Sequence, residues 1–129
     1  MSYYHEYTLN KKNMSELTNL DKIHHQDCLE FLKKQRANSV DLIVTSPPYA
    51  DKRKKTYTGI PAKQYVTWFL PISKELKRVL KPTGSFVLNI KEPAVNGERA
   101  TYVLELILEM KKQEWLWIEE YVWHKKNSF

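Results

Sequence analysis

The chain has 129 residues, which suits one small domain, and its net charge of +6 favours a polyanionic partner such as nucleic acid. Its single cysteine, Cys28, excludes an internal disulfide and fits a reducing compartment, so we expect a cytoplasmic protein. No apolar run approaches the roughly 20 residues that a membrane span needs, and the first residues lack the apolar segment of a signal peptide, so no membrane partner is expected.

The first half of the chain predicts an arm, a helix and a strand. Residues 1–20 are polar and aperiodic, and we expect an N-terminal arm ahead of a domain at 21–129. Residues 27–36 predict a helix, with Asp27 at its N-cap and Glu30 as the partner in a capping box. Residues 39–45, SVDLIVT, are short, largely apolar and rich in β-branched side chains, which is typical of a strand covered on both faces.

A long loop at 46–62 is followed by helical spacing that Pro71 is expected to kink or restart. The predicted inner face of this helix carries Val66, Phe69, Leu70, Ser73, Leu76 and Leu80. Residues 81–85, KPTGS, predict a turn, and residues 85–90 predict a second apolar strand.

The last third of the chain predicts a loop, a helix and a strand. Residues 92–99 are expected to form a loop, and an amphipathic helix follows from Arg99. The aromatic, largely alternating residues 114–125 predict a third strand. The order of elements predicts an α/β fold with right-handed crossovers: a partial Rossmann-like sheet with helices on both faces. Because three or four strands make a narrow sheet, we expect a fragment of a larger protein.

Ser46, Pro47, Pro48 and Tyr49 lie at the carboxyl end of the first predicted strand, where open α/β sheets bind ligands. Two prolines fix the backbone and remove two N–H donors. The loop therefore offers carbonyl acceptors, a hydroxyl and an aromatic face. This combination suits a planar group that carries an amino donor, and a nucleobase turned out of the duplex has that shape.

The stretch DLIVTSPPY, together with its flanks, resembles amino-group DNA methyltransferases, whose motif is (D/N/S)-P-P-(Y/F/W). DCLEFLKKQR, LKRVLKPTGSFVLNI and YVWHKKN are similar to neighbouring segments of that family. The resemblance implies methyl transfer from S-adenosylmethionine to adenine N6 or cytosine N4 in DNA, as in restriction-modification systems. The serine form is similar mostly to the cytosine-N4 branch.

The resemblance also implies roles for individual residues. Ser46 and the Pro47 carbonyl would hold the target amine beside Pro48, and Tyr49 would stack on the base. Asp27 would contact the cofactor adenine. The expected DNA contacts are Lys52, Arg53, Lys54 and Lys55 in the loop, and Trp123, Lys125 and Asn127 in the third strand.

The motif order resembles the β arrangement, in which the glycine-rich cofactor loop and the target-recognition region come later. The only glycines are Gly59, Gly84 and Gly97, and none forms a Gly-x-Gly pair. We therefore expect the catalytic half of a methyltransferase domain with an incomplete cofactor site. Its expected partners are DNA and a missing half or second chain, with a homodimer also possible.

Several structural explanations compete with these functional ones. Asp27 serves equally as a simple N-cap, the basic loop as a solvated surface, and the aromatic residues of 114–125 as sheet packing. Cys28 lacks the Pro-Cys context of cytosine-C5 chemistry and is expected in the core. The histidines show no metal-ligand spacing, so no metal is expected. Alternative functions are methylation of RNA bases or another planar amine, and a non-catalytic nucleic-acid-binding or assembly module.

Overall fold

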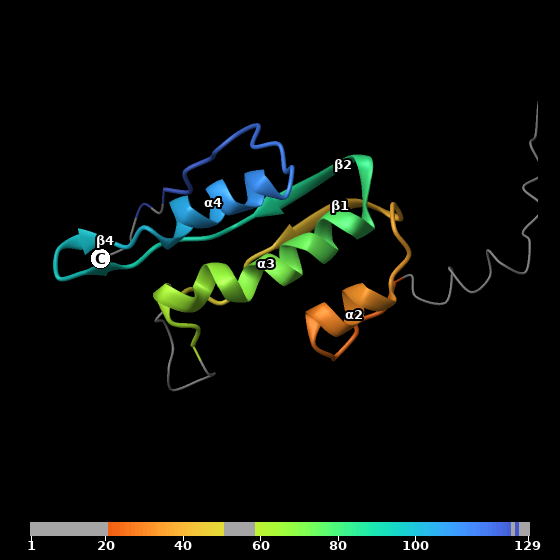
Figure 1. The fold of residues 1–129 in the computed structure, drawn as a ribbon, viewed down its shortest axis with the longest axis horizontal. Coiled ribbons are helices and arrows are strands. Elements are labelled where there is room, and N and C mark those ends of the chain that lie inside the picture. The colour runs from red at the N-terminus through yellow and green to blue at the C-terminus, as the bar shows by residue number, and fades with distance from the viewer. Residues whose placement is uncertain (1–20, 51–58, 125, 127–129) are drawn as a thin grey trace, which may run out of the picture.

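The protein is described by a computed structural model that covers residues 21–50, 59–124 and 126 (Figure 1). Three helices and four strands occur in this part of the chain. In chain order they are α2 (Cys28–Lys34), β1 (Val40–Thr45), α3 (Ala62–Val79), β2 (Leu80–Leu88), β3 (Ala94–Val95), β4 (Glu98–Arg99) and α4 (Tyr102–Lys112). The predicted arm at 1–20 lies outside the described residues.

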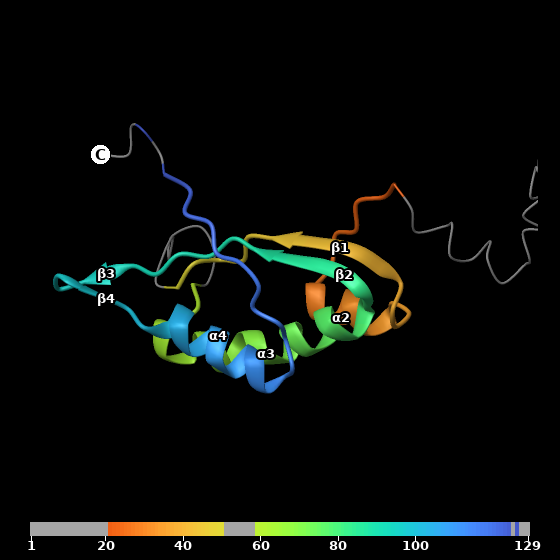
Figure 2. The ribbon, with the colours of Figure 1, turned by 90° about the horizontal axis from the view of Figure 1, so that it is seen from above.

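β1 and β2 form a parallel pair, and α3 is the connection between them. Seen from above, α2, α3 and α4 lie in one layer beneath this pair (Figure 2). A parallel strand pair with a crossover helix confirms the prediction of a partial α/β fold. The prediction of helices on both faces is not met within the described residues, where all three helices share one side.

The uncovered face of the sheet is apolar. Leu42, Val44 and Val87 are exposed by 57%, 65% and 50% respectively. Successive strand residues point to opposite faces, so a run that is apolar at nearly every position places side chains on both. This pattern led to the expectation that β1 would be covered on both sides. One of its faces is open in the described structure.

The parallel register contains an irregularity at its start. Val40 pairs with Leu80, but the next residue pair is Leu42 with Ser85, and regular pairing then continues to Thr45 with Leu88. The predicted turn at 81–85 is therefore an outward bulge within β2. Gly84 is required there, because a Cβ atom would lie 2.9 Å from the Asp41 carbonyl oxygen and equally close to the Leu80 side chain.

The core lies between α3, α4 and the inner face of the sheet. Tyr65, Phe69, Leu76 and Val79 of α3 are buried together with Tyr102, Leu106 and Met110 of α4. Four residues of the predicted inner face, Phe69, Ser73, Leu76 and Leu80, are buried, and its other two, Val66 and Leu70, are half-buried. The helix continues through Pro71, which is exposed and does not restart it. α4 confirms the predicted amphipathic helix.

α2 begins and ends with side-chain caps. Asp27 Oδ1 accepts hydrogen bonds from the backbone N–H groups of Leu29 (3.0 Å) and Glu30 (3.1 Å), which confirms the predicted N-cap. Glu30 pairs with Lys33 at 2.8 Å. Cys28, which was expected in the core, is exposed because it occupies the solvent side of the first turn.

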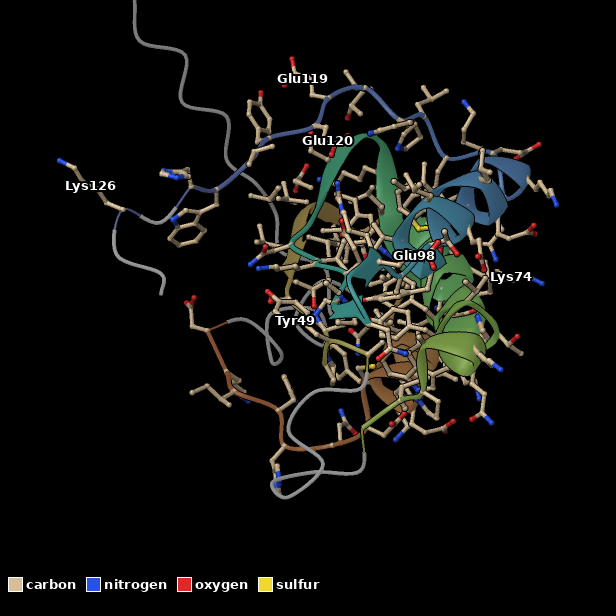
Figure 3. All side chains as sticks on the ribbon, turned by 90° about the vertical axis from the view of Figure 1, so that its left-hand side faces the viewer. Tyr49, Lys74, Glu98, Glu119, Glu120 and Lys126 are labelled. Carbon is tan, nitrogen blue, oxygen red and sulfur yellow. The ribbon has the colours of Figure 1, made fainter. Side chains whose placement is uncertain are left out.

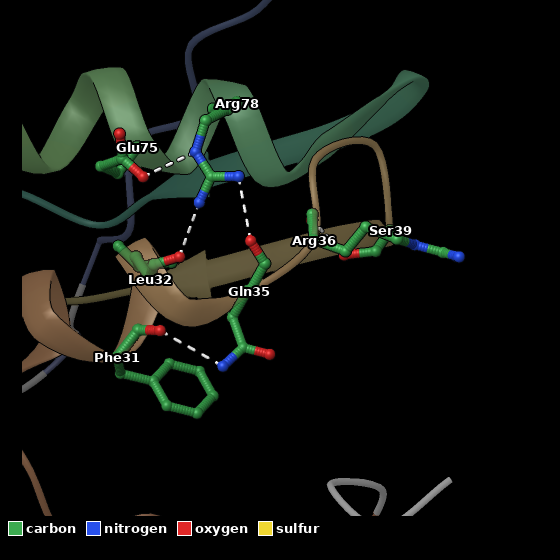
Figure 4. Close-up of polar contacts among 7 residues, drawn as sticks. All are labelled: Phe31, Leu32, Gln35, Arg36, Ser39, Glu75 and Arg78. Atoms are coloured by element: carbon green, nitrogen blue, oxygen red, sulfur yellow. Dashed lines mark hydrogen bonds and ion pairs between the residues drawn. The ribbon is translucent and has the colours of Figure 1, made fainter. Parts of the chain in front are cut away.

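Arg78 of α3 binds the carboxyl end of α2. Its guanidinium donates to the carbonyl oxygens of Leu32 (2.7 Å) and Gln35 (2.9 Å) and pairs with Glu75 at 2.7 Å (Figure 4). The Leu32 carbonyl also accepts from the Gln35 N–H at 2.9 Å; the planar guanidinium adds a second donor there and supplies one to the carbonyl of the C-cap residue Gln35. The contact fixes α2 against α3.

Residues 92–99, predicted to be a loop, form the short antiparallel hairpin β3–β4. Asn96 and Gly97 have φ values of 53° and 81°, the left-handed conformation of a tight hairpin turn. The Asn-Gly pair was the signal that the sequence analysis overlooked.

The predicted third strand is wrong. Residues 114–124, the described part of the predicted strand at 114–125, belong to no strand, and their large apolar side chains from Leu116 onward are at least half exposed. Alternation of side chains does not make a strand unless a neighbouring backbone pairs with it. No helix in the described part of the chain is long and apolar enough to cross a membrane.

Candidate active site at the carboxyl edge of the sheet

The loop that contains Ser46 and Tyr49 begins directly after β1, at the carboxyl end of the parallel pair. Parallel strands bring their carboxyl ends to the same edge, so the residue after β2 must lie close by. That residue is Asn89, and its backbone N–H donates to the Thr45 carbonyl at 2.9 Å. The hydrogen-bond ladder between β1 and β2 thus continues one residue beyond the ends of the two strands and places Asn89 beside Ser46.

Three polar side chains meet at this edge. The Ser46 and Tyr49 hydroxyl oxygens are 3.5 Å apart, and Asn89 Nδ2 donates to Ser46 Oγ at 3.5 Å. Both contacts are at the long limit of a hydrogen bond, and Ser46 and Asn89 are exposed. Catalytic hydrogen bonds are often long before substrate binds. The Ser46 hydroxyl is therefore positioned and still open to another partner.

The loop is anchored at its far end. Pro47, Pro48 and Tyr49 are half-buried, and Ala50 is fully buried at 0% exposure. Each proline fixes its φ angle, so the path from β1 to Ala50 has few alternatives. Figure 3 views this edge and shows Tyr49 on the sheet side of the molecule, away from Lys74 on the outer side of the helix layer.

The segment after β2 is held by the first turn of α4. The Tyr102 hydroxyl donates to the Lys91 carbonyl, and Tyr102 packs against Tyr65 of α3 with ring centroids 4.6 Å apart. Pro93 is buried and accepts a hydrogen bond from the Ala100 N–H at 3.0 Å. These contacts stiffen the chain directly beyond Asn89.

Three ionisable groups of the described residues, all outside this edge, have perturbed pKa values. Partial desolvation, and then the negative charge of Asp27, raise the pKa of the Cys28 thiol, although the residue as a whole is exposed. A hydrogen bond to Glu30 raises the pKa of Lys33, and one to Glu119 raises the pKa of Tyr121. These three groups lie away from Ser46, whose described contacts are with Tyr49 and Asn89.

The predicted site residues fall into three groups. Ser46, Pro47, Pro48 and Tyr49 lie at the sheet edge as expected, while Asp27 caps α2 and Trp123 is exposed in the segment after α4. The remaining predicted DNA contacts lie outside the described residues: Lys52, Arg53, Lys54, Lys55, Lys125 and Asn127. Within residues 21–50, 59–124 and 126, no three His, Cys, Asp or Glu side chains gather as a metal site would require.

Asn89 is the site residue that the sequence analysis missed. It stood in the second predicted strand, and its distance of 43 residues from Ser46 concealed the contact. The available signal was its position: a polar side chain that ends an apolar strand lies at the same edge as the loop after the neighbouring parallel strand.

The glycines form no Gly-x-Gly turn. Nucleotide cofactors bind where a glycine-rich turn brings the backbone close to them, and Gly59, Gly84 and Gly97 lie far apart along the chain. Gly84 lies in the β2 bulge and Gly97 in the hairpin turn. Asp27 uses Oδ1 for both of its cap bonds.

The chain is similar in sequence to known DNA methylases. A family model described as DNA methylase matches residues 40–129. Type II methyltransferase M.PvuII of Proteus hauseri is 32% identical over 105 residues, an alignment that covers 79% of this chain and 31% of that protein. DNA adenine methyltransferase YhdJ of Escherichia coli (strain K12) is 37% identical over 73 residues, covering 53% of this chain and 24% of that protein.

A solved structure titled PvuII DNA methyltransferase (cytosine-N4-specific) resembles this fold. The TM-score is 0.59 at 35% identity, and the match covers 70% of this chain and 33% of that one. The chain thus spans about a third of the length of M.PvuII and of this solved structure.

Proposed function

This chain belongs to the N6/N4 DNA methylase family, and on that premise we propose that it is the catalytic portion of an S-adenosylmethionine-dependent DNA methyltransferase. The proposed product carries the methyl group on the exocyclic nitrogen of a flipped base, cytosine N4. One observation carries the proposal: the Ser46–Tyr49 loop lies at the carboxyl edge of a parallel pair, with a hydroxyl held open beside an aromatic ring.

The proposed mechanism acts on the amino group. The nitrogen of cytosine N4 shares its lone pair with the ring, which makes it a poor nucleophile. Hydrogen bonds from its two N–H groups to Ser46 Oγ and the Pro47 carbonyl favour a pyramidal nitrogen whose lone pair points away from the ring. Tyr49 holds the base by stacking. The nitrogen loses a proton after the methyl group has been transferred, so no strong base is required beforehand.

The choice of base rests on the serine and on the relatives. The solved neighbour is titled cytosine-N4-specific, and it is the structure that supports cytosine here. Adenine N6 is the second candidate, because YhdJ is named a DNA adenine methyltransferase and adenine offers a similar amino group. A non-catalytic assembly module is the third.

The cofactor half is proposed to come from outside residues 1–129. Two features support a further polypeptide partner: the chain spans about a third of M.PvuII, and one face of the sheet exposes Leu42, Val44 and Val87. A second copy of this chain is the competing occupant. DNA is the proposed substrate partner, and the net charge of +6 favours its approach.

The test is a methylation assay with S-adenosylmethionine, DNA and a polypeptide that carries the glycine-rich loop and target-recognition region of a family member. Nucleosides from the digested DNA are identified by mass spectrometry. N4-methylcytosine is the expected product. N6-methyladenine would overturn the base assignment, and DNA binding without methylation by the complemented chain would favour the assembly module.

Two variants of Tyr49 sharpen this test. Tyr49→Ala removes the stacking face and should weaken capture of the base by about 1–3 kcal/mol. Tyr49→Phe keeps the face and loses only a hydroxyl contact of 3.5 Å, so it should stay close to wild type. Equal loss in both variants would mean that the ring does not hold the base.

A further inference from the structure

We propose that Asn89 is a positioning residue that fixes the orientation of the Ser46 hydroxyl; the inference rests on the proposed function of that loop. Asn89 is not part of the Ser-Pro-Pro-Tyr motif and lies on the other strand. Its contact with Ser46 joins the two strand ends at the reacting edge of the sheet.

The register of β1 and β2 fixes the backbone of Asn89. Ile43, Val44 and Thr45 pair with Phe86, Val87 and Leu88, so residues 46 and 89 are the next in line. The bond of 2.9 Å from the Asn89 N–H to the Thr45 carbonyl shows that this register persists beyond the ladder. The position of the Asn89 backbone is therefore fixed by the sheet.

The segment that follows Asn89 is anchored by contacts with α4. Tyr102 binds the Lys91 carbonyl two residues after Asn89, and the buried Pro93 follows. Asn89 thus lies between the sheet ladder on one side and an anchored segment on the other. The fixed backbone leaves only the χ1 and χ2 rotations of Asn89 open, and the contact with Ser46 Oγ favours one of these rotamers.

The direction of the hydrogen bond between Asn89 and Ser46 decides what the Ser46 hydroxyl can still accept. The amide nitrogen of Asn89 is only a donor, so it occupies one lone pair of Ser46 Oγ. The hydroxyl keeps its other lone pair to accept from a substrate amine, and its proton is directed elsewhere, with Tyr49 Oη 3.5 Å away. Without this donor the hydroxyl can rotate and present its proton to the amine instead.

The charge of the donor also matters. An amide stays neutral, so it positions Ser46 without withdrawing its proton. A carboxylate at the same place accepts hydrogen bonds and turns the hydroxyl toward itself. Asn89→Asp therefore inverts the contact at nearly constant size, while Asn89→Ala deletes it.

The first arm of the experiment needs no turnover. In ¹⁵N NMR spectra of the full chain, Ser46→Ala should shift the side-chain amide resonances of Asn89 and leave its backbone amide nearly unchanged. Ser85→Ala is the matched control, because Ser85 is an exposed serine on β2. Unchanged Asn89 side-chain resonances in Ser46→Ala would overturn the proposal.

The second arm uses the complemented methylation assay. We expect Asn89→Ala to lower kcat about 3- to 10-fold, as for one oriented hydrogen bond, with KM for DNA unchanged. Asn89→Asp should keep more of the wild-type kcat than Asn89→Ala, because a carboxylate that accepts the Ser46 proton still directs it away from the amine and leaves a lone pair of Oγ free. A wild-type kcat in Asn89→Ala would overturn the positioning role.

The two arms separate this proposal from the proposed function. If the wild-type chain transfers no methyl group, the function fails, and the NMR arm alone decides whether Asn89 binds Ser46. If the wild type is active and Asn89→Ala alters only thermal stability, Asn89 is structural and the proposal fails.

Discussion

Two serines of this molecule occupy opposite kinds of environment. Ser73 on α3 is fully buried; its hydroxyl donates to Gln113 Oε1 at 2.7 Å and accepts from Trp115 Nε1 at 2.9 Å. Ser46 is exposed and makes two contacts of 3.5 Å. The Ser73 hydroxyl uses its proton and a lone pair in short hydrogen bonds within the protein. The Ser46 hydroxyl is held only by long contacts and can still bind another group. The residue type is the same, so the surroundings decide between stability and chemistry.

The two regions around these serines differ in the same way. The helix layer contains short, complementary bonds: Arg78 binds two α2 carbonyls, and Lys77 donates to the Gln113 carbonyl at 2.6 Å. The sheet edge contains long contacts on a backbone fixed by other groups. Substitutions in the two regions should therefore affect different measurements.

The largest expected effect is on turnover. Ser46→Ala in the complemented enzyme should lower kcat about 10²–10³-fold, or roughly 2–4 kcal/mol, because its contact with the amine strengthens in the transition state. DNA binding and Tm should stay near wild type, with Ser85→Ala as the control. Full activity in Ser46→Ala would remove the distinction between the two serines.

Next in size is the junction of α2 and α3. Arg78→Ala removes the donors to Leu32 and Gln35 and should lower the free energy of unfolding by about 2–3 kcal/mol in urea titrations. Arg78→Lys keeps the charge without the planar guanidinium, so its free energy of unfolding should lie between those of wild type and Arg78→Ala. Turnover per folded molecule should not change; an equal loss of activity would show that the two regions are coupled.

Ser73→Ala should have a smaller effect on stability, about 1–2 kcal/mol. It leaves Gln113 Oε1 and Trp115 Nε1 without their serine partner in a buried place. Thermal unfolding monitored by tryptophan fluorescence measures this loss. A Tm equal to wild type would mean that water replaces the hydroxyl there.

The smallest effect concerns Cys28. Because its pKa is raised, mainly by desolvation, alkylation by iodoacetamide at pH 8 should be slower than for a free cysteine. Asp27→Asn removes the neighbouring charge but keeps a good N-cap, so alkylation should accelerate less than about threefold.

The raised pKa of Cys28 also fixes the sign of a pH effect on stability. The thiol ionises less readily in the folded chain than in the unfolded one, so its contribution to stability is lost as pH rises through the folded pKa. Cys28→Ser serves as the control because the chain has no other cysteine. Alkylation at the free-cysteine rate would contradict the desolvation.

The sequence was sufficient where the signal was local. The N-cap at Asp27, the apolar run of β1 and the helical spacing of α3 and α4 depend on neighbours within a few residues, and each is confirmed. The position of the Ser46 loop followed from its place after β1. The roles of the loop residues remain predictions.

The rest depended on contacts between distant segments. Residues 114–125 have the composition of a strand, but pairing is a property of two segments, and no partner is available in the described structure. The meeting of Asn89 and Ser46 depends on the register of two strands and on the extra residues that β2 inserts opposite Asp41. No local pattern encodes that offset.

The bulge in β2 acts as a spacer that sets which residue at the carboxyl end of β2 stands beside the Ser46–Tyr49 loop that follows β1. Gly84 allows the backbone of the bulge to approach the Asp41 carbonyl closely. Lys81 pairs with the Asp41 carboxylate at 2.7 Å, so two contacts hold the bulge against β1. A one-residue slip would place Leu88 or Ile90 where Asn89 stands and would reverse the inward and outward faces of β2. A one-residue insertion or deletion at the amino end of the sheet would therefore change which side chain faces Ser46 at the carboxyl edge, although no residue at that edge is substituted.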